Sequence, residues 1–471
     1  MLEGRFPGSK SKDPINLIPM QDRLLPMSTL TTQLRPHDPA VRPAPRNGAS
    51  SAAERRGKTA LVLAGGGITG AVYEVGALRA MDDLLVDSTV NDFDIYVGTS
   101  AGALVNSFIA NGFAPGQVMQ LINDRHPELH GFQLADIFRP NIEEAAQRIT
   151  QAPGLFWSVC KHFVRNPGDV SVSDLVWEAA RLLPAGMYDG GALERYVRNT
   201  LDRNDSVNSF GRLKKELYIV ASELDSGARA VFGKGHMDEV PISLAVAASS
   251  AVPALYRPVQ IYEKDYLDGM LHGAASLDLA IEAGAKLIVC VNPMVPFNAS
   301  EVRPQEHYIR RNGLQAVVNQ SLRTLLYSSL RYHIKNLRTK HPDVDIILIQ
   351  PEMDDHEIFS HGPMDYAGRL QVAQHGFESV TRGLLKNRAY FSSVLGRHGI
   401  ATHTDLVRAE LEALATSTPA NHIARDVIEA KHGVPGRASL ASAINQLELS
   451  MRRLADSIDH AAAGKTVELM H

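Results

Sequence analysis

The chain has 471 residues, of which 44% are hydrophobic and 21% are charged, a composition ordinary for globular proteins. Its formal net charge of −4 argues against a strongly basic nucleic-acid-binding surface, so we expect no nucleic-acid partner. Cysteine occurs only at Cys160 and Cys290, which excludes a disulfide scaffold and a cysteine-rich zinc module.

No segment of the sequence has both the length and the apolarity of a membrane span. The longest nearly apolar stretch, residues 242–256, is interrupted by serines and a proline. The N-terminus carries charged residues where a signal peptide needs an apolar run. We therefore expect a cytoplasmic protein whose membrane contact, if it has any, is peripheral.

Composition and patterning divide the chain into four parts. Residues 1–57 hold eight of the 25 prolines and little periodicity, which predicts a disordered arm. Residues 58–295 carry the strand and helix patterns of a folded core. Residues 296–390 are expected to extend this core with a late strand and helices, and residues 391–471 to form a helical tail.

Short apolar runs predict the strands, and spacings of three and four residues predict the helices. In chain order the predicted strands are residues 59–64, 93–97, 217–221, 230–232, 262–267, 287–291 and 346–349, the last of which we expect to be the final strand. Helices are predicted over residues 71–85 and 103–110. This alternation predicts an α/β layered core with a central, largely parallel sheet.

Three further apolar groups stand outside this pattern. An aromatic patch within residues 155–163 is expected to pack in the core, with insertion into a lipid interface as the alternative. A stripe at Val318, Leu322, Leu326, Leu330, Ile334 and Leu337 predicts one apolar helix face. Residues 440–458 repeat with the four-three spacing of a short coiled-coil seam, which we expect to pack within the chain, although oligomerisation through this helix stays open.

Ser100 lies in a Gly-x-Ser-x-Gly pattern between a predicted strand and a predicted helix. This context suits a nucleophile, because a tight strand-to-helix turn exposes the serine Oγ atom. Gly98 and Gly102 lack the Cβ atoms that would crowd such a turn, and the following helix N-terminus favours negative charge. A turn serine with a purely structural role is the alternative.

A glycine-rich loop with Gly65, Gly66, Gly67 and Gly70 follows the first predicted strand. Its backbone N–H groups suit an anion, which leaves two functional uses: a phosphate cradle for a dinucleotide, as in an oxidoreductase, or an oxyanion hole for acyl transfer. A dinucleotide fold needs an acidic residue at the end of the second strand, whereas here that strand runs into Ser100. We therefore favour the oxyanion hole over the cradle, and over a glycine turn that only permits close packing.

The order of these motifs departs from the ordinary α/β-hydrolase. A familiar triad would supply a histidine base, and the chain has 18 histidines. Several strands precede the nucleophile in that fold, whereas here a single predicted strand precedes the nucleophile's own strand. This spacing points to a different serine-hydrolase layout.

Five segments in order resemble the patatin-like phospholipase family: residues 61–70, 97–103, 222–227, 248–254 and 266–269. The resemblance covers about half of the chain, roughly residues 60–295. It implies a three-layer α/β core and a Ser–Asp dyad without a catalytic histidine, metal or cofactor. By position, it implies Ser100 as the nucleophile and Asp268 as the general base, which Gly269 follows in the acid motif.

The resemblance also implies an activity: hydrolysis of carboxylic esters of phospholipids or acylglycerols through an acyl-serine intermediate, with Gly65, Gly66 and Gly67 in the oxyanion loop. Two positions depart from the family pattern, because Thr69 replaces a basic residue and Met270 replaces a small one. These departures leave open a non-catalytic lipid-binding or scaffold protein on the same fold, in which Asp268 is only a turn residue.

Overall fold

The computed structural model describes residues 57–148, 150, 183–203, 206–302, 308–405, 407, 408 and 411. The predicted arm before residue 57, the aromatic patch within residues 155–163 and the seam over residues 440–458 lie outside the described residues. The division of the chain into four parts stays a prediction.

Eight strands form the central sheet: β1 (Lys58–Leu63), β3 (Ile95–Thr99), β5 (Glu216–Glu223), β6 (Arg229–Gly233), β8 (Val259–Ile261), β9 (Lys264–Asp268), β10 (Ala285–Val291) and β11 (Asp345–Ile349). Their order is β11-β10-β1-β3-β5-β9-β8, and β6 also pairs with β5. The strands from β11 to β5 are mutually parallel, whereas β6, β8 and β9 pair antiparallel. The predicted largely parallel sheet is therefore confirmed.

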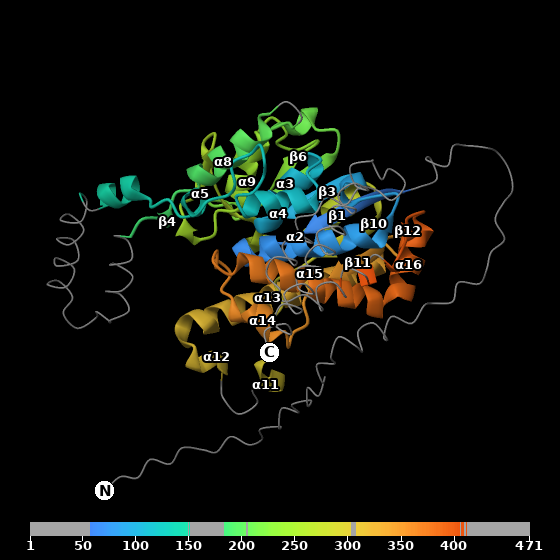
Figure 1. Cartoon of the computed structure of the whole chain (residues 1–471). Coiled ribbons are helices and arrows are strands. Elements are labelled where there is room, and N and C mark those ends of the chain that lie inside the picture. Colours follow the sequence, from blue (N-terminus) through green and yellow to red (C-terminus); the bar gives the residue numbers. More distant parts are fainter. Residues whose placement is uncertain are drawn as a thin grey trace, which may run out of the picture. The chain divides into compact units, whose positions relative to one another are not determined.

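Helices cover both faces of this sheet. The described helices are α2 (Gly67–Leu84), α3 (Ala101–Ala110), α4 (Pro115–Ile122), α5 (Leu134–Ile137), α8 (Gly191–Leu201), α9 (Ile242–Ser249), α10 (Leu277–Glu282), α11 (Ala299–Val302), α12 (Tyr308–Arg311), α13 (Gly313–Lys340), α14 (His356–Ser360), α15 (Arg369–Lys386) and α16 (Arg388–Arg397). Short 3-10 turns are η1 (Val90–Asp92), η2 (Phe210–Arg212) and η3 (Gly269–His272). Figure 1 shows α2 and α15 side by side along the sheet.

Alternating side chains of the parallel strands build two separate cores, because successive residues of a strand face opposite sides. Leu61 and Leu63 of β1 join a cluster with α2, α3, α9 and α15 on one face. Ala60 and Val62 join a cluster with α10 and α13 on the other. The result is the expected three-layer α/β fold, with the sheet buried between two helical layers.

The expectation that residues 346–349 form the final strand is wrong. Strand β12 (Ala401–Thr402) follows and pairs antiparallel with β2 (Leu85–Val86). The sequence pattern also does not predict β8 or the parallel pair of β4 (Gly186–Tyr188) with β7 (Ala254–Tyr256). Strands of two or three residues are too short to leave an apolar pattern in the sequence.

The apolar stripe over residues 318–337 is buried only in its second half. Leu326 and Leu330 pack against the sheet, but Val318 is 54% exposed and Leu322 is 42% exposed. A spacing of four residues exceeds the 3.6 residues of a helical turn, so the stripe rotates around α13. The predicted apolar stripe is therefore present on α13, but the sheet covers only its second half.

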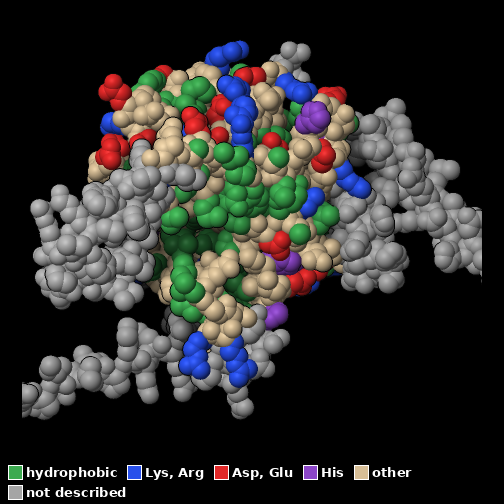
Figure 2. All heavy atoms as spheres, turned by 90° about the vertical axis from the view of Figure 1, so that its left-hand side faces the viewer, with side chains coloured by type: hydrophobic (Ala, Val, Ile, Leu, Met, Phe, Trp, Pro, Cys, Tyr) green, Lys and Arg blue, Asp and Glu red, His purple; other side chains and the backbone are tan. Residues whose placement is uncertain are grey.

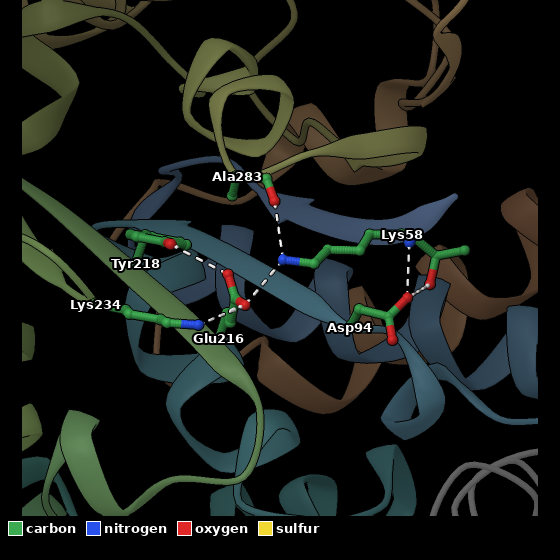
Figure 3. A network of polar contacts seen from close by, with 7 residues as sticks. Lys58, Asp94, Glu216, Tyr218, Lys234 and Ala283 are labelled. Atoms are coloured by element: carbon green, nitrogen blue, oxygen red, sulfur yellow. Dashed lines mark hydrogen bonds and ion pairs between the residues drawn. The ribbon is translucent and has the colours of Figure 1, made fainter. Parts of the chain in front are cut away.

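Charged side chains connect the beginnings of the parallel strands, at the end of the sheet opposite the glycine motifs (Figure 3). Lys58 Nζ donates to Glu216 at 2.9 Å and to the carbonyl oxygen of Ala283 at 3.0 Å, and Lys234 Nζ reaches the same carboxylate of Glu216 at 3.0 Å. The backbone N–H of Thr59 donates to Asp94 at 2.8 Å. Exposed ion pairs of this kind contribute little stability each, so their main effect is to align the strand ends.

Candidate active site

The glycine loop and Ser100 lie next to each other, at the carboxyl ends of β1 and β3. Adjacent parallel strands end at the same edge of a sheet, where open α/β proteins place their sites. The loop of residues 64–66 leads from β1 into α2, and Ser100 joins β3 directly to α3. The two sequence motifs therefore meet through the pairing of these two strands.

Ser100 adopts a backbone conformation that serine rarely takes, with φ of 54° and ψ of −119°. Such strain persists only where the surroundings enforce it, and it is typical of a nucleophile elbow. The backbone N–H of Ser100 donates to Ser249 Oγ at 2.8 Å, and Ser249 Oγ donates to the carbonyl oxygen of Val220 at 2.6 Å. Helix α9 and strand β5 thereby hold the turn.

Gly98 and Gly102 allow this turn by their lack of side chains. A Cβ atom at Gly98 would overlap the backbone of Ala103, and one at Gly102 would overlap the carbonyl group of Leu63. In the actual chain the N–H of Gly102 donates to the carbonyl oxygen of Ala64 at 3.1 Å. The two glycines thus let β3, α3 and the end of β1 approach closely.

Asp268 ends β9 and meets Ser100 across 168 residues of chain. Ser100 Oγ donates to Asp268 Oδ2 at 2.6 Å, and the backbone N–H of Met270 donates to Oδ1 at 2.9 Å. Both side chains are buried. Burial raises the pKa of Asp268 to about 7, against the opposing effect of these two hydrogen bonds.

The backbone of Asp268 is itself fixed on both sides. Its N–H donates to the carbonyl oxygen of Ala251 at 2.9 Å, and Ser222 Oγ donates to its carbonyl oxygen at 3.0 Å. Gly269 passes so close to Val220 that a Cβ atom there would overlap the Val220 carbonyl group. A larger residue at position 269 would therefore displace the carboxylate.

The glycine loop presents backbone N–H groups beside Ser100. Gly67 begins α2 with a φ of +65°, and α3 begins at Ala101, so two helix N-termini converge on the serine. The described hydrogen bonds give no protein acceptor to the N–H groups of Gly66, Gly67 and Ala101. N–H groups in this setting stabilise an anion. Gly66 and Gly70 also lie close to the ring of Pro293, so a Cβ atom at either position would crowd that ring.

The two departures from the family pattern have structural counterparts. The N–H and hydroxyl of Thr69 both donate to the carbonyl oxygen of Pro363, at 3.2 and 3.3 Å. Thr69 thus joins the glycine loop to a distant segment instead of supplying a charge. The side chain of Met270 lies directly against Gly65, where it occupies the space of a Cβ atom, and Ser100 lies on the same side.

An apolar pocket opens from Ser100 between α2, α3, α4 and α8. Its volume is about 860 Å³ when the part open to solvent is included. Phe108, Leu121, Phe132, Met364 and Tyr366 are among its lining residues, and Met270 is not. Such a pocket suits a long apolar group whose reacting end lies at Ser100.

The described residues offer neither a clustered metal site nor a membrane-spanning helix. They contain no cluster of three or more His, Cys, Asp or Glu side chains placed to hold a metal ion. No helix among them is both long enough and apolar enough to cross a bilayer.

Several side chains that build the site are not identified by the sequence analysis. Ser222 and Ser249 fall in segments that carry the family resemblance, but nothing local marks them as supports of Asp268 and Ser100. Met364 and Tyr366 line the pocket from about 260 residues beyond Ser100, and Pro363 precedes them in the chain, so none of the three gives a local signal. Their role depends on a tertiary contact through Thr69.

The buried carboxylate predicts a pH-dependent cost to stability. The folded protein holds the Asp268 proton more tightly than the unfolded chain, whose pKa is near 3.8, so stability falls as pH rises from about 4 to about 7. Asp268→Asn removes this titration. Its free energy of unfolding relative to wild type should therefore increase across that interval and level off above it, in denaturant titrations at several pH values.

Asp278→Asn is the matched control with the opposite sign. Burial alone would raise the pKa of Asp278, but its contacts with His333 and Arg229 outweigh that effect and lower the pKa to about 2. Loss of this carboxylate should cost stability increasingly as pH rises from about 2 to about 4. A pH-independent difference between Asp268→Asn and wild type would contradict the raised pKa of Asp268.

Comparison with curated proteins gives two distant relatives. The uncharacterized protein YqhO of Bacillus subtilis is 24% identical over 207 residues, which span 42% of this chain and 57% of the relative. The uncharacterized protein YjjU of Escherichia coli is 26% identical over 270 residues, which span 56% of this chain and 60% of the relative. The alignments thus cover less than two thirds of either relative.

Solved structures give weak matches. VipD of Legionella pneumophila aligns over 70% of this chain and 67% of its own, with 14% identity and a TM-score of 0.31. The ExoU–SpcU complex of the Pseudomonas aeruginosa type III secretion system provides a chain that aligns over 79% of this chain and 68% of its own, with 14% identity and a TM-score of 0.23.

The segment that matches a family model contains most of the candidate site. The family model described as "Patatin-like phospholipase" matches residues 61–281, a range that begins in β1, ends in α10 and includes both Ser100 and Asp268. The resemblance read from the sequence motifs is therefore confirmed by a match to this family over residues 61–281.

Proposed function

We propose that this protein is a lipid acyl hydrolase in which Ser100 and Asp268 form the catalytic dyad. The observation that carries the proposal is the 2.6 Å hydrogen bond from Ser100 Oγ to Asp268 Oδ2, buried at one end of an apolar pocket. The substrates would be carboxylic esters of phospholipids or acylglycerols. The match to the patatin-like phospholipase family supports lipid ester hydrolysis in general, whereas the dyad and the substrates are our proposal.

The proposed reaction has two acyl-transfer steps. Asp268 accepts the Oγ proton as Ser100 attacks the ester carbonyl carbon, and the alcohol leaves with that proton when the tetrahedral intermediate collapses. Water then attacks the acyl-serine, Asp268 takes its proton and returns it to Ser100 Oγ, and the free acid departs. The N–H groups of Gly66, Gly67 and Ala101 would bind the oxyanion in both steps.

The environment of Asp268 supports its role as a base without histidine. An ordinary aspartate is a weak base, but a pKa near 7 matches the proton affinity that general-base catalysis needs at neutral pH. The Met270 N–H binds Oδ1 of Asp268, which leaves Oδ2 to accept the hydrogen bond from Ser100 Oγ. The strained turn keeps Ser100 Oγ within reach of that oxygen.

The surroundings of Ser100 suggest where the two parts of an ester would bind. The apolar pocket would hold the acyl chain, because its lining is almost entirely hydrophobic. Met270 lies against Gly65 outside that pocket, so the alcohol would leave on its side. Lipid esters reside in membranes, so the enzyme, which we propose to be cytoplasmic, would work in peripheral contact with a lipid surface.

Ser100→Ala should reduce kcat/KM for esters and phospholipids by about 10⁴-fold or more, because it removes the nucleophile. Asp268→Asn should lose about 10³-fold in the same panel, since its amide cannot accept the proton. Circular dichroism of both variants checks that the fold is kept. Full hydrolysis by Ser100→Ala would sink the mechanism, whereas no hydrolysis by the wild type would favour a non-catalytic lipid-binding protein.

Met270→Ala should favour bulky alcohol groups, because it removes the side chain beside Gly65. We expect kcat/KM for esters of a large alcohol to rise about tenfold relative to methyl esters of the same acid. Met364→Ala is the matched control, since Met364 lines the apolar pocket and should change the dependence on acyl length instead. Equal effects of the two variants on both series would contradict this assignment of the two binding sides.

A further inference from the structure

Helix α13 exposes large apolar side chains on the face that points away from the sheet. Leu314, Val317, Val318, Leu322, Leu325 and Tyr332 form what we call the outer face of α13. Leu314 is 80% exposed and Leu325 is 70% exposed. The helix is thus apolar on two opposite sides, because Leu326, Leu330, Ile334 and Leu337 are buried against the sheet.

This pattern differs from that of an ordinary covering helix, whose solvent side is polar. Leu314, Val318, Leu325 and Tyr332 are separated by four, seven and seven residues, so they lie on one line along the helix. A continuous exposed apolar stripe marks a surface that contacts something other than water.

The charge of the same segment indicates what that contact is. Residues 308–340 contain seven Lys and Arg residues and no Asp or Glu, although the whole chain has a net charge of −4. Five of these basic residues are exposed on α12 and α13: Arg310, Arg311, Arg331, Lys335 and Lys340. Exposed apolar side chains flanked by basic ones are the composition of a helix that lies in an anionic lipid interface.

Helix α13 also passes beside the segment that follows Asp268 in the chain. Turn η3 begins directly after Asp268 and is followed by Gly273. A Cβ atom at Gly273 would lie 3.9 Å from Ser329 Oγ of α13. Leu271 of this turn is itself 60% exposed. Figure 2 views the side where α12 and the start of α13 lie in Figure 1, and shows hydrophobic side chains around a hollow, with Lys and Arg at its lower edge.

We propose that the outer face of α13, with the basic residues beside it, docks the protein on an anionic lipid surface. The apolar side chains enter the boundary between headgroups and acyl chains, while the basic ones contact the phosphates. This inference rests on the proposed function, because it supplies the contact through which a hydrolase of lipid esters would reach its substrate.

Charge disfavours two other occupants of this surface. A symmetric dimer through the outer face of α13 would bring two basic segments against each other, since a two-fold interface pairs identical patches. The C-terminal residues 412–471 contain six Lys and Arg against seven Asp and Glu, so they offer little complementary charge. An anionic bilayer matches both the apolar stripe and the basic residues.

The test measures vesicle binding by the full chain in a Ser100→Ala background, so that hydrolysis does not alter the lipid. We expect binding to vesicles of phosphatidylcholine with phosphatidylglycerol, at least tenfold weaker binding to phosphatidylcholine alone, and weakening by added salt. Leu314→Ser with Leu325→Ser should reduce binding to the mixed vesicles at least tenfold. Tyr262→Ser is the matched control, because Tyr262 is 69% exposed in the turn between β8 and β9, at the opposite edge of the sheet from β11.

The same double substitution, with Ser100 intact, should hydrolyse a soluble short-chain ester at the wild-type rate. This arm separates the two proposals: loss of ester hydrolysis in Ser100→Ala reports on the catalytic role, whereas vesicle binding reports on α13 alone. Unchanged vesicle binding by the double variant would overturn the docking proposal. So would a wild-type dimer that the double substitution converts to a monomer, because the outer face would then be an interface between two copies.

Discussion

The site depends on one short hydrogen bond, from Ser100 Oγ to the buried carboxylate of Asp268. The bond joins two strand ends that are far apart in sequence, so it exists only if β3, β5 and β9 keep their register. Close backbone contacts enforce that register at Gly98, Gly102 and Gly269, where any side chain would overlap a neighbouring strand or helix. The hydroxyl of Ser249 adds a second fixed point, since it bonds both the Ser100 N–H and β5.

The cost of this arrangement lies in the burial of a carboxyl group. Burial raises the pKa of Asp268 to about 7, so the ionised form that can act as a base is destabilised in the folded protein. The strained backbone at Ser100 adds a further cost of about 1–3 kcal/mol. Both features make the fold less stable, and the surrounding three-layer core offsets their cost.

Local pattern alone predicts the parts of the site that lie in one segment. The glycine loop and Ser100 each sit between a strand and a helix, and the apolar runs beside them are enough to indicate that context. Asp268 has no such signature, because an Asp-Gly pair is more often a simple turn, and only the family resemblance marks it. Ser222, Ser249 and the contact of Thr69 with Pro363 arise from tertiary packing, which no spacing rule encodes. The outer face of α13 is missed for a related reason: a four-residue spacing predicts an apolar stripe but not which part of it the sheet covers.

The most direct test of the central claim is the pH dependence of Ser100 modification by a fluorophosphonate probe, with the labelled residue located by mass spectrometry. If Asp268 is the base, the labelling rate of Ser100 rises about tenfold per pH unit below pH 7 and levels off above it. Asp268→Asn should label far more slowly and without this inflection. A labelling rate whose pH dependence inflects near pH 4 in the wild type would contradict the dyad. So would an inflection near pH 7 that persists in Asp268→Asn.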